Sequence, residues 1–433
     1  MGPAGEGARR ACGTVGPMFR RSRALFDPVT IHLDGEPIPA ERGEPLAAAL
    51  LAADKTILAR SPKLHRPRGP SCFRGGCDGC LARVDGVPNV MTCLVPARGG
   101  EQISAQNVVG SRKADLLRVT DWFFPKGIDH HHMLAGVPGL SDVMQTVASK
   151  VAGMGRLPST PDLPRPARRL QADAVVVGGG LTGLTVASRL GAAGRRVVLF
   201  DDGLALGGAL ACSSRGAAEL RALPLGGVEV FSRAAAAGFY DGELLVVTAS
   251  REAIVVRPRA TLFATGAHDG VLAVPDNDLP GVLSARALCR LLLAGVEPDG
   301  PTALVGEGFW ADELVAALGD RPVLRVAPAD VVDVRGTGGV RAITVRENGV
   351  LATHRIAVVA LALPGAPAFE LAAQAGAEAR FDGVLGYVVV VDERGRAGEG
   401  LWAAGECTGK PFAPDALRAE AERVAADMLA ALG

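Results

Sequence analysis

Four cysteines in one short region constrain this chain more than any other feature. Cys72, Cys77, Cys80 and Cys93 have the spacing C-x4-C-x2-C-x12-C, and three of them lie in the stretch GPSCFRGGCDGC. The first three match the ligand run of a plant-type [2Fe-2S] cluster, in which a loop wraps the cluster and another element supplies the fourth thiolate. Zinc and unligated thiols are alternatives, but zinc sites usually pair two C-x2-C motifs and this chain has one. We therefore expect these thiols to hold a [2Fe-2S] cluster.

Length and charge exclude several classes of protein. A chain of 433 residues is long enough for two or three domains, each with its own core. Its 46 Lys and Arg balance 46 Asp and Glu, so no global field attracts nucleic acid or an anionic membrane. No apolar run reaches the roughly 18 residues of a membrane span. The Arg-rich start lacks the apolar stretch of a secretory signal, which predicts a cytoplasmic protein with reduced thiols.

The residues around the cysteines predict a small mixed sheet with one helix. VTIHLDGEPIPAERGEPLAAALLAA contains an alternating strand at Val29–Leu33, an Asp-Gly turn, a second strand and a helix that begins near Pro45. LARVDGVPNVMTC repeats the strand and turn pattern. We expect a flexible tail at 1–25, a ferredoxin-like domain at 26–108, and a helical and Pro-rich linker at 109–169. Three adjacent histidines in that linker, 130 to 132, point in different directions and predict packing rather than a metal site.

A strand, a glycine turn, a helix and an acid follow in the order of a dinucleotide-binding unit. ADAVVVGGGLTGLTVASRLGAAGRRVVLFDDG has G-x-G-x-x-G at Gly178, Gly180 and Gly183, after an apolar strand. The glycines permit the tight turn, the approach of the pyrophosphate and the close packing of the helix. Asp201 ends the second strand, where a carboxylate accepts hydrogen bonds from ribose hydroxyls. This pattern predicts dinucleotide binding.

Three further stretches favour FAD over NAD at this first turn. They look like the FAD-binding set of flavoproteins with two dinucleotide folds: LALGGAL, TLFATGAHDG and GLWAAGECTG. The expected cofactor residues in them are Gly207, Gly208, Thr265, Gly266, Gly405 and Glu406. The acid of the last motif is more often Asp, and Glu406 still allows contact with the ribityl chain. The alternative is a flavoprotein fold that has lost its flavin. His268 either lies near the cofactor or holds the end of its strand.

A second glycine turn gives weaker evidence for NAD(P). TALVGEGFWADELVAAL carries Gly306 and Gly308, with Ala311 in the third glycine position. Bulky Phe309 and Trp310 occupy the turn, and no acid clearly ends the next strand, PVLRV. We expect a retained scaffold without a nucleotide more than a working NAD(P) site.

Disulfide-reductase chemistry is disfavoured, because it requires a thiol pair beside the flavin. The one C-x2-C pair belongs to the predicted cluster. The remaining cysteines are isolated in the sequence, and we expect them to be small buried residues: Cys12, Cys212, Cys289 and Cys407.

The stretches PRGPSCFRGGCDGCLARVDGVPNVMTC, DWFFPKGIDHH and VAGMGRLP resemble the alpha subunits of heterotetrameric sarcosine oxidase. They also resemble the ferredoxin-like components of hydrogen cyanide synthase, opine oxidase and amino-acid dehydrogenase complexes. The resemblance implies an α/β chain with an N-terminal β-grasp ferredoxin-like domain, followed by a two-dinucleotide-binding, Rossmann-like flavoprotein fold. We expect an FAD-binding domain at 170–299 and 360–433, and a reduced NAD(P)-like inserted domain at 300–359. Sarcosine oxidase alpha subunits continue into a folate-binding domain beyond the region that this sequence resembles, so we expect relatives without that domain to be the better models.

The resemblance also implies a function. The chain would be the electron-transfer subunit of a multi-subunit FAD-dependent amine or amino-acid dehydrogenase or oxidase, an oxidoreductase. A separate FAD-containing, amine-oxidase-like beta subunit, with further small subunits in some complexes, would oxidise the C–N bond. The alternatives are a self-sufficient NAD(P)H-dependent flavin and iron-sulfur reductase, and a non-catalytic assembly subunit with vestigial cofactor sites. The amine, the final acceptor and the direction of electron flow are not readable from the sequence.

Overall fold

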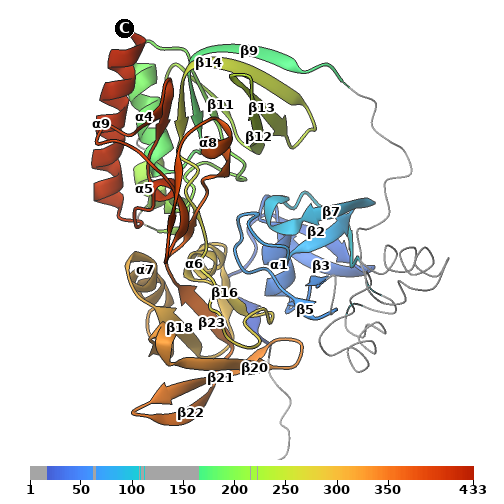
Figure 1. Ribbon diagram of the computed structural model, residues 1–433. Helices are drawn as coiled ribbons and strands as arrows, with labels where there is room; N and C mark the ends of the chain where they lie inside the picture. The colour runs from blue at the N-terminus through green and yellow to red at the C-terminus, as the bar shows by residue number, and fades with distance from the viewer. Residues whose placement is uncertain are drawn as a thin grey trace, which may run out of the picture.

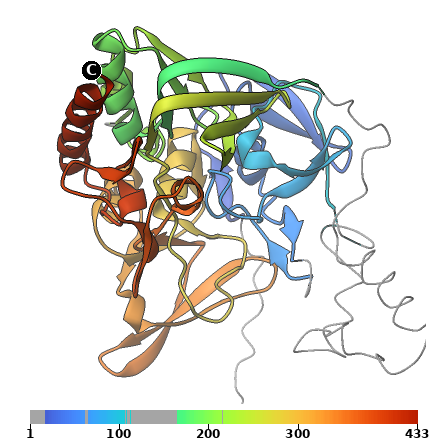
Figure 2. The same ribbon diagram turned by 45° about the horizontal axis from the view of Figure 1, so that its top comes forward.

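Three α/β units make up the described part of the chain (Figure 1). The computed structural model describes residues 17–61, 65–106, 108, 112, 165–214, 216–221 and 223–433. An N-terminal unit lies beside two Rossmann-like units, one carrying the C-terminal helix and one carrying a three-stranded sheet at its far end (Figures 1 and 2). Cys12, the histidines 130 to 132 and nearly all of the predicted linker lie outside the described residues.

The N-terminal unit is a five-stranded mixed sheet, in the order β3-β2-β8-β6-β7, with helix α1 packed on it. The predicted hairpin is present: Asp34 and Gly35 join β2 to β3 with φ angles of 52° and 84°. This arrangement confirms the predicted ferredoxin-like fold. Its elements are β2 Pro28–Leu33, β3 Glu36–Glu41, α1 Leu46–Ala52, β4 Ala59–Arg60, β5 Pro67–Arg68, β6 Leu81–Val84, β7 Val87–Met91, η1 Thr92–Leu94 and β8 Gln102–Ser104.

The first Rossmann-like unit is an eight-stranded sheet in which strands β11, β10, β9, β14 and β28 run parallel. Helices α4 and α9 cover one face, and their apolar side chains share a core with β9 and β14. The strands are β9 Arg168–Val177, β10 Val197–Phe200, β11 Val228–Phe231, β12 Ala234–Tyr240, β13 Glu243–Thr248, β14 Ala253–Phe263, β27 Arg396–Gly398 and β28 Leu401–Ala403. The helices are α4 Leu181–Ala192, η3 Leu210–Cys212, α5 Gly216–Arg221, α8 Glu370–Gln374, η5 Glu406–Thr408 and α9 Pro414–Leu432. Two short strand pairs adjoin the sheet: β15 Ala267–His268 with β24 Ala366–Pro367, and β25 Ala379–Asp382 with β26 Gly386–Val389.

The second Rossmann-like unit has a parallel sheet in the order β16-β23-β18-β19. Because β16 pairs with β23, this sheet begins before residue 300, the limit that we predicted from the sequence. Its elements are β16 Val282–Ser284, α6 Ala285–Leu293, β18 Thr302–Gly306, α7 Phe309–Leu318, β19 Val323–Val326, η4 Pro328–Asp330 and β23 Val358–Ala362. A separate antiparallel sheet consists of β20 Val331–Gly336, β21 Val340–Glu347 and β22 Val350–Arg355.

The predicted loose tail requires a correction for its last residues. Phe19–Arg21 forms strand β1, which pairs antiparallel with β17, Val296–Pro298. The arginines of this segment suggest a solvated tail, but Phe19 between them is 2% exposed in the core. Arg21 forms an ion pair with Glu44 at 2.7 Å, so the charge of this arginine is neutralised by a carboxylate of the N-terminal unit.

One apolar core joins the N-terminal unit to the second Rossmann-like unit. Buried side chains of α1 share a cluster with those of α6 and α7. The loop that carries the first cysteines also contacts α6, because the Ser284 N–H donates to the Ser71 carbonyl at 2.9 Å and Arg290 donates to the Phe73 carbonyl at 2.5 Å. The cysteine loop is therefore held against the Rossmann-like half of the molecule.

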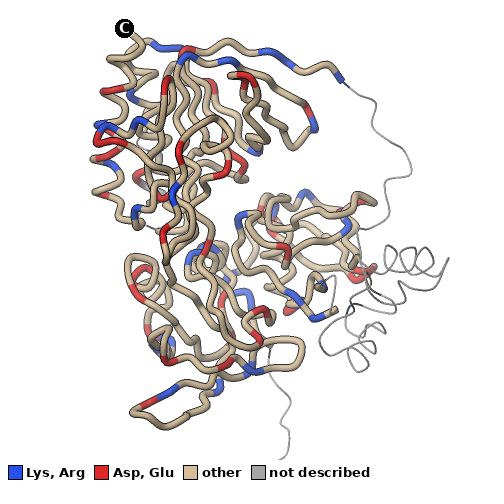
Figure 3. Tube along the Cα trace, viewed as in Figure 1, with Lys and Arg blue, Asp and Glu red and all other residues tan. Residues whose placement is uncertain are grey.

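Charges of both signs are mixed along all three units (Figure 3). Among the described residues, no helix is both long and apolar enough to span a membrane.

Candidate iron-sulfur and dinucleotide site

The four predicted cluster cysteines form two pairs. Cys72 and Cys77 lie in the loop between β5 and β6, with their Sγ atoms 3.4 Å apart. Cys80 precedes β6 and contacts Cys93 of η1. Cys72, Cys80 and Cys93 are buried, and Cys77 is partly exposed.

The two pairs suit a two-iron cluster, because each iron of such a cluster takes two thiolates. Within the described residues, no three His, Cys, Asp or Glu side chains converge as they would around a single ion.

The backbone of the loop is shaped around Cys72. The N–H groups of Arg74 and Gly76 point at the Cys72 Sγ, at 3.4 and 3.2 Å. Gly79 lies so close to the Gly69 carbonyl that a Cβ would be 1.9 Å from its oxygen. Such N–H donors stabilise a thiolate, which is the form that binds iron. The donor set and the loop therefore fit a [2Fe-2S] cluster.

Contact within each thiol pair shifts the two pKa values in opposite directions. The hydrogen bond from Cys72 lowers the pKa of Cys77 to about 5. The same contact, together with burial, raises the pKa of Cys72 well above its usual range. Contact with Cys93 likewise lowers the pKa of Cys80, and the pKa of Cys93 is raised. The lowered pKa of Cys77 and of Cys80 favours the thiolate, which is the form that binds iron.

The first glycine turn has the close packing that its sequence predicts. Gly178 follows β9 with a φ of 103°, and a Cβ on it would lie 2.2 Å from the Ala264 carbonyl oxygen. A Cβ on Gly183 would lie 1.9 Å from the Gly178 oxygen. Gly180 is the residue before α4, so the N-terminus of this helix opens toward the turn. A helix N-terminus in this setting attracts phosphate.

Asp201 stands at the end of β10 beside this turn. Its carboxylate accepts the Gly179 N–H at 2.7 Å and the Gly203 N–H at 2.9 Å. Burial raises the pKa of Asp201, and the two N–H donors oppose that rise. Each carboxylate oxygen accepts one of these bonds and has a further lone pair, which a ribose hydroxyl can use.

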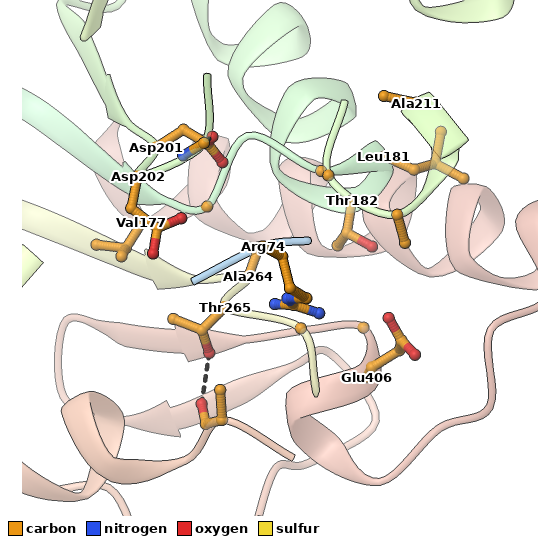
Figure 4. Close-up of a pocket in the computed structure, with 18 of the residues that line it drawn as sticks. Arg74, Val177, Leu181, Thr182, Asp201, Asp202, Ala211, Ala264, Thr265 and Glu406 are labelled. Carbon is orange, nitrogen blue, oxygen red and sulfur yellow. Dashed lines mark hydrogen bonds between the residues drawn. The ribbon is translucent and has the colours of Figure 1, made fainter. Parts of the chain in front are cut away.

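A cavity of about 600 Å³ adjoins these groups (Figure 4). Its wall includes most of the predicted cofactor residues: Gly178, Gly180, Asp201, Gly208, Thr265, Gly266, Gly405 and Glu406. Gly207 touches this wall through its bridge to Gly180, and Gly183 lies one turn behind it in α4. The Thr265 hydroxyl donates to the Ala368 carbonyl at 2.5 Å, which fixes the end of the β14 strand.

Residues of the N-terminal unit line the same cavity. Cys72 and Arg74 contribute to its wall, and Arg74 points into it between Thr182 and Glu406 (Figure 4). The Arg74 Nη1 also donates to the Ala267 carbonyl at 2.5 Å. The cysteine loop and the glycine turn are therefore two walls of one cavity.

A buried ion network closes the cavity at α6. Arg286 donates to Asp269 at 2.7 Å and lies 3.4 Å from Glu406. Burial raises the pKa of Glu406, while the charges of Arg286 and Arg74 oppose that rise. Arg74 and Arg286 were not predicted as site residues from the sequence. Arginine on the otherwise apolar stretch ARALCRLLL was the available signal for Arg286, whereas Arg74 was hidden inside the cysteine motif.

The second glycine turn lies apart from this cavity. Gly306 ends β18 and Gly308 precedes α7, as predicted, but neither lines the cavity. Phe309, Trp310 and Phe412 pack together over the start of α7, with ring centroids 4.9 to 5.1 Å apart. The aromatic side chains thus pack together beside the second turn.

The other cysteines and His268 have different surroundings. Cys289 and Cys407 are buried, and burial raises the pKa of Cys289 to about 12 and that of Cys407 to about 11. Both thiols are therefore protonated at neutral pH and unreactive. Cys212 is buried at the cavity wall, and His268 is exposed beside the cysteine loop, where it also lines the cavity.

Two family models match the chain. Residues 27–108 match the 2Fe-2S iron-sulfur cluster binding domain, and residues 176–231 match the NAD(P)-binding Rossmann-like domain. Over 416 residues the chain is 30% identical to the alpha chain of sarcosine oxidase from Rhizobium meliloti (strain 1021), a match that covers 82% of this chain and 42% of that protein. The chain is a homologue of sarcosine oxidase alpha subunits.

Shorter matches extend this relationship. An opine oxidase component from Agrobacterium tumefaciens (strain Ach5) is 30% identical over 185 residues, which are 36% of this chain and 37% of that protein. L-Proline dehydrogenase from P. horikoshii has the same fold, with a TM-score of 0.72 and 21% identity, over 95% of this chain and 75% of that chain. The chain spans less than half the length of the sarcosine oxidase alpha subunits that it matches. The homology confirms the predicted resemblance, and the fold confirms a ferredoxin-like domain followed by a Rossmann-like flavoprotein fold.

Proposed function

We propose that this homologue is the electron-transfer subunit of a multi-subunit, FAD-dependent amine or amino-acid dehydrogenase or oxidase. In this proposal Cys72, Cys77, Cys80 and Cys93 hold a [2Fe-2S] cluster, and the cavity at the first glycine turn holds FAD. The single observation that carries the proposal is the shared cavity, whose wall includes both Cys72 and the glycine turn. Electron transfer requires the cluster and the flavin to lie close together. A cavity lined by both Cys72 and the glycine turn would place them so.

The residues of this chain would bind and orient the two groups. The N-terminus of α4 and Asp201 are suited to the diphosphate and a ribose of FAD. Glu406 and Thr265 lie across the cavity from Asp201 and the N-terminus of α4 (Figure 4). When bound, a flavin takes up two electrons and releases them singly, while a [2Fe-2S] cluster carries one at a time. The buried thiols and the loop N–H groups would set how readily the cluster accepts an electron.

The substrate would be oxidised elsewhere. Curated relatives bear the names of oxidase subunits, which supports assembly with other subunits. We propose that the partner is an FAD-containing, amine-oxidase-like beta subunit that oxidises the C–N bond, with no nucleic acid involved. The proposed location is the cytoplasm, whose reducing conditions keep cysteine thiols available as ligands.

Cofactor analysis of the chain tests this proposal. Protein purified without oxygen should contain iron, acid-labile sulfide and FAD. Cys77→Ser should remove the iron-sulfur absorbance and leave bound FAD, because Cys77 is at the partly exposed edge of the loop. Cys407→Ser, at a buried thiol outside the cysteine loop, is the matched control and should retain both groups. Protein that contains FAD but neither iron nor sulfide would contradict the proposal.

A self-sufficient NAD(P)H reductase is the second candidate. The match of residues 176–231 to an NAD(P)-binding domain favours it, although that match is to the first turn rather than to Gly306. Addition of NADH or NADPH to the oxidised chain without a partner separates the two candidates. Rapid bleaching of the flavin absorbance would support the reductase, and an unchanged spectrum would support the electron-transfer role. A colourless protein would instead support an assembly role with vestigial sites.

A further inference from the structure

Three arginines line the cavity, and two of them have their hydrogen-bonding groups engaged. Arg286 is paired with Asp269 and Glu406. Arg290 donates to the carbonyls of Phe73 and Gly208, at 2.5 and 3.4 Å. These two side chains therefore hold the cavity wall together rather than face a ligand.

Arg74 differs from the other two. Among the residues that the structure describes, the only hydrogen-bond partner of its side chain is the Ala267 carbonyl, which accepts from Nη1. A guanidinium has five N–H donors in a planar fork, so most of the donor capacity of Arg74 is left for a ligand. In Figure 4 the fork lies between Thr182, in the first turn of α4, and Glu406 on the opposite side.

The position of Arg74 suits a diphosphate. The N-terminus of α4 offers backbone N–H groups to an anion from one side. Several carboxylates also line the cavity: Asp201, Asp202, Glu370 and Glu406. A dinucleotide diphosphate would be repelled by these acids unless a cation lies close to it, and a planar fork binds phosphate oxygens in pairs.

We propose that Arg74 binds the diphosphate of the dinucleotide, so that a residue of the iron-sulfur domain completes the nucleotide site of the Rossmann-like unit. Arg74 lies two residues after Cys72 and three before Cys77. A nucleotide bound to it would hold the cysteine loop in place, and a filled cluster would in turn hold Arg74 toward the nucleotide. Because coupling between two sites is reciprocal, each group then tightens the binding of the other.

This inference rests on the proposed dinucleotide site but not on electron transfer. Binding of ADP measures it directly, because ADP carries the diphosphate whichever dinucleotide is resident. Adenosine is the matched probe, since it lacks both phosphates. Failure of electron transfer would leave the ADP result unaffected, so the two proposals fail separately.

Isothermal titration of the nucleotide-depleted full-length chain, with its cluster retained, tests the proposal. Arg74→Gln should weaken ADP and FAD binding by about 10- to 100-fold, the range for loss of a charged hydrogen bond. Adenosine affinity should change by less than about twofold. Arg98→Gln, an exposed arginine of the same domain that does not line the cavity, is the control and should change nothing. Unchanged ADP binding, or an equal loss for adenosine, would overturn the proposal.

A measurement on the unaltered protein keeps the test open if Arg74→Gln does not fold. Phenylglyoxal modifies exposed arginines, and peptide mass spectrometry reports the extent at Arg74. ADP should slow modification of Arg74 by about tenfold, and adenosine should not slow it. Equal modification of Arg74 with and without ADP would contradict the assignment.

Discussion

The first glycines of the two turns have the same φ angle and equally close packing, but the two turns have different surroundings. Gly178 and Gly306 both have a φ of 103°, and a Cβ on either would lie 2.2 Å from a carbonyl oxygen of the neighbouring strand. The first turn opens into a cavity, whereas aromatic rings cover the start of the helix at the second. The turn geometry alone therefore does not decide whether a nucleotide binds.

The aromatic rings also connect the two turns. Phe412 lines the cavity of the first turn and contacts Phe309 and Trp310 of the second. Arg286, which pairs with Glu406 at the first site, lies over the Trp310 ring at 5.9 Å from its centroid. The aromatic side chains of the second turn thus contact two side chains that line the cavity of the first.

Substitutions at the third position of the glycine motif should differ most between the two turns in their effects on stability and on dinucleotide binding. Gly183→Ala should lower the free energy of unfolding by about 3 kcal/mol, because the new Cβ would lie 1.9 Å from the Gly178 oxygen. We also expect it to weaken dinucleotide binding by about 100-fold, as the turn must move. The corresponding change at the second turn, Ala311→Gly, should cost only about 1 kcal/mol and leave binding unchanged.

Urea unfolding and FAD titration measure both effects. Equal effects of Gly183→Ala and Ala311→Gly on binding would break the distinction between the turns.

The acid at the end of the second strand should give the next largest effect. Asp201→Asn should weaken FAD binding by about tenfold, because an amide cannot accept from both backbone N–H groups and a ribose hydroxyl with equal strength. Asp330→Asn is the matched control, since Asp330 is in η4 beyond β19 and outside the cavity. The comparison fails if the two variants bind FAD equally.

A carboxylate of α9, the helix that covers the first Rossmann-like unit, should contribute to stability in a pH-dependent way. Asp427 of α9 accepts from Arg396 at 2.6 Å and from Trp402 at 3.0 Å, and these contacts lower its pKa. A lowered pKa stabilises the fold above the unfolded value near 4, and this contribution disappears as the pH falls through the folded value. Asp427→Asn should therefore cost about 1 to 2 kcal/mol at pH 7 and progressively less below about pH 4.

Unfolding of both proteins by urea at several pH values measures this. A constant gap between the native protein and Asp427→Asn across the acid range would rule out the ionised carboxylate as its cause.

The smallest effect concerns the aromatic side chains at the second turn. If the missing acid also prevents binding there, removal of the rings should not create a site. Phe309→Ala with Trp310→Ala should therefore leave NADH binding weaker than about 1 mM. Titration followed by NADH fluorescence, with FAD retained at the first site, tests this. NADH binding in the micromolar range would instead show that the aromatic rings alone keep NADH out of the second turn.

The sequence predicts the local geometry well and the contacts between units poorly. The spacing of the glycines and the apolar strands before them predicted both turns. Gly178 and Gly306 each have a positive φ angle, which is a local requirement of the backbone. Cysteine spacing predicted the loop for the same reason. The role of Phe19 depends on a partner strand almost 280 residues away, and nothing near it in the sequence signals that pairing.

Local sequence patterns also did not predict the cavity that the two units share. Arg74 is an ordinary loop residue in sequence, and its direction is set by docking of the cysteine loop on α6 through Arg290 and Ser284. Such long-range contacts arise from tertiary packing, which residue spacing does not encode.

Electron passage between the two groups tests the central claim most directly. The chain should be purified without oxygen, its flavin reduced by light in the presence of a sacrificial donor, and its cluster followed by electron paramagnetic resonance. The signal of a reduced [2Fe-2S] cluster should grow as the flavin is reduced, and it should be absent in Cys77→Ser with the flavin still reducible. A flavin that becomes fully reduced while an intact cluster stays oxidised would contradict the account.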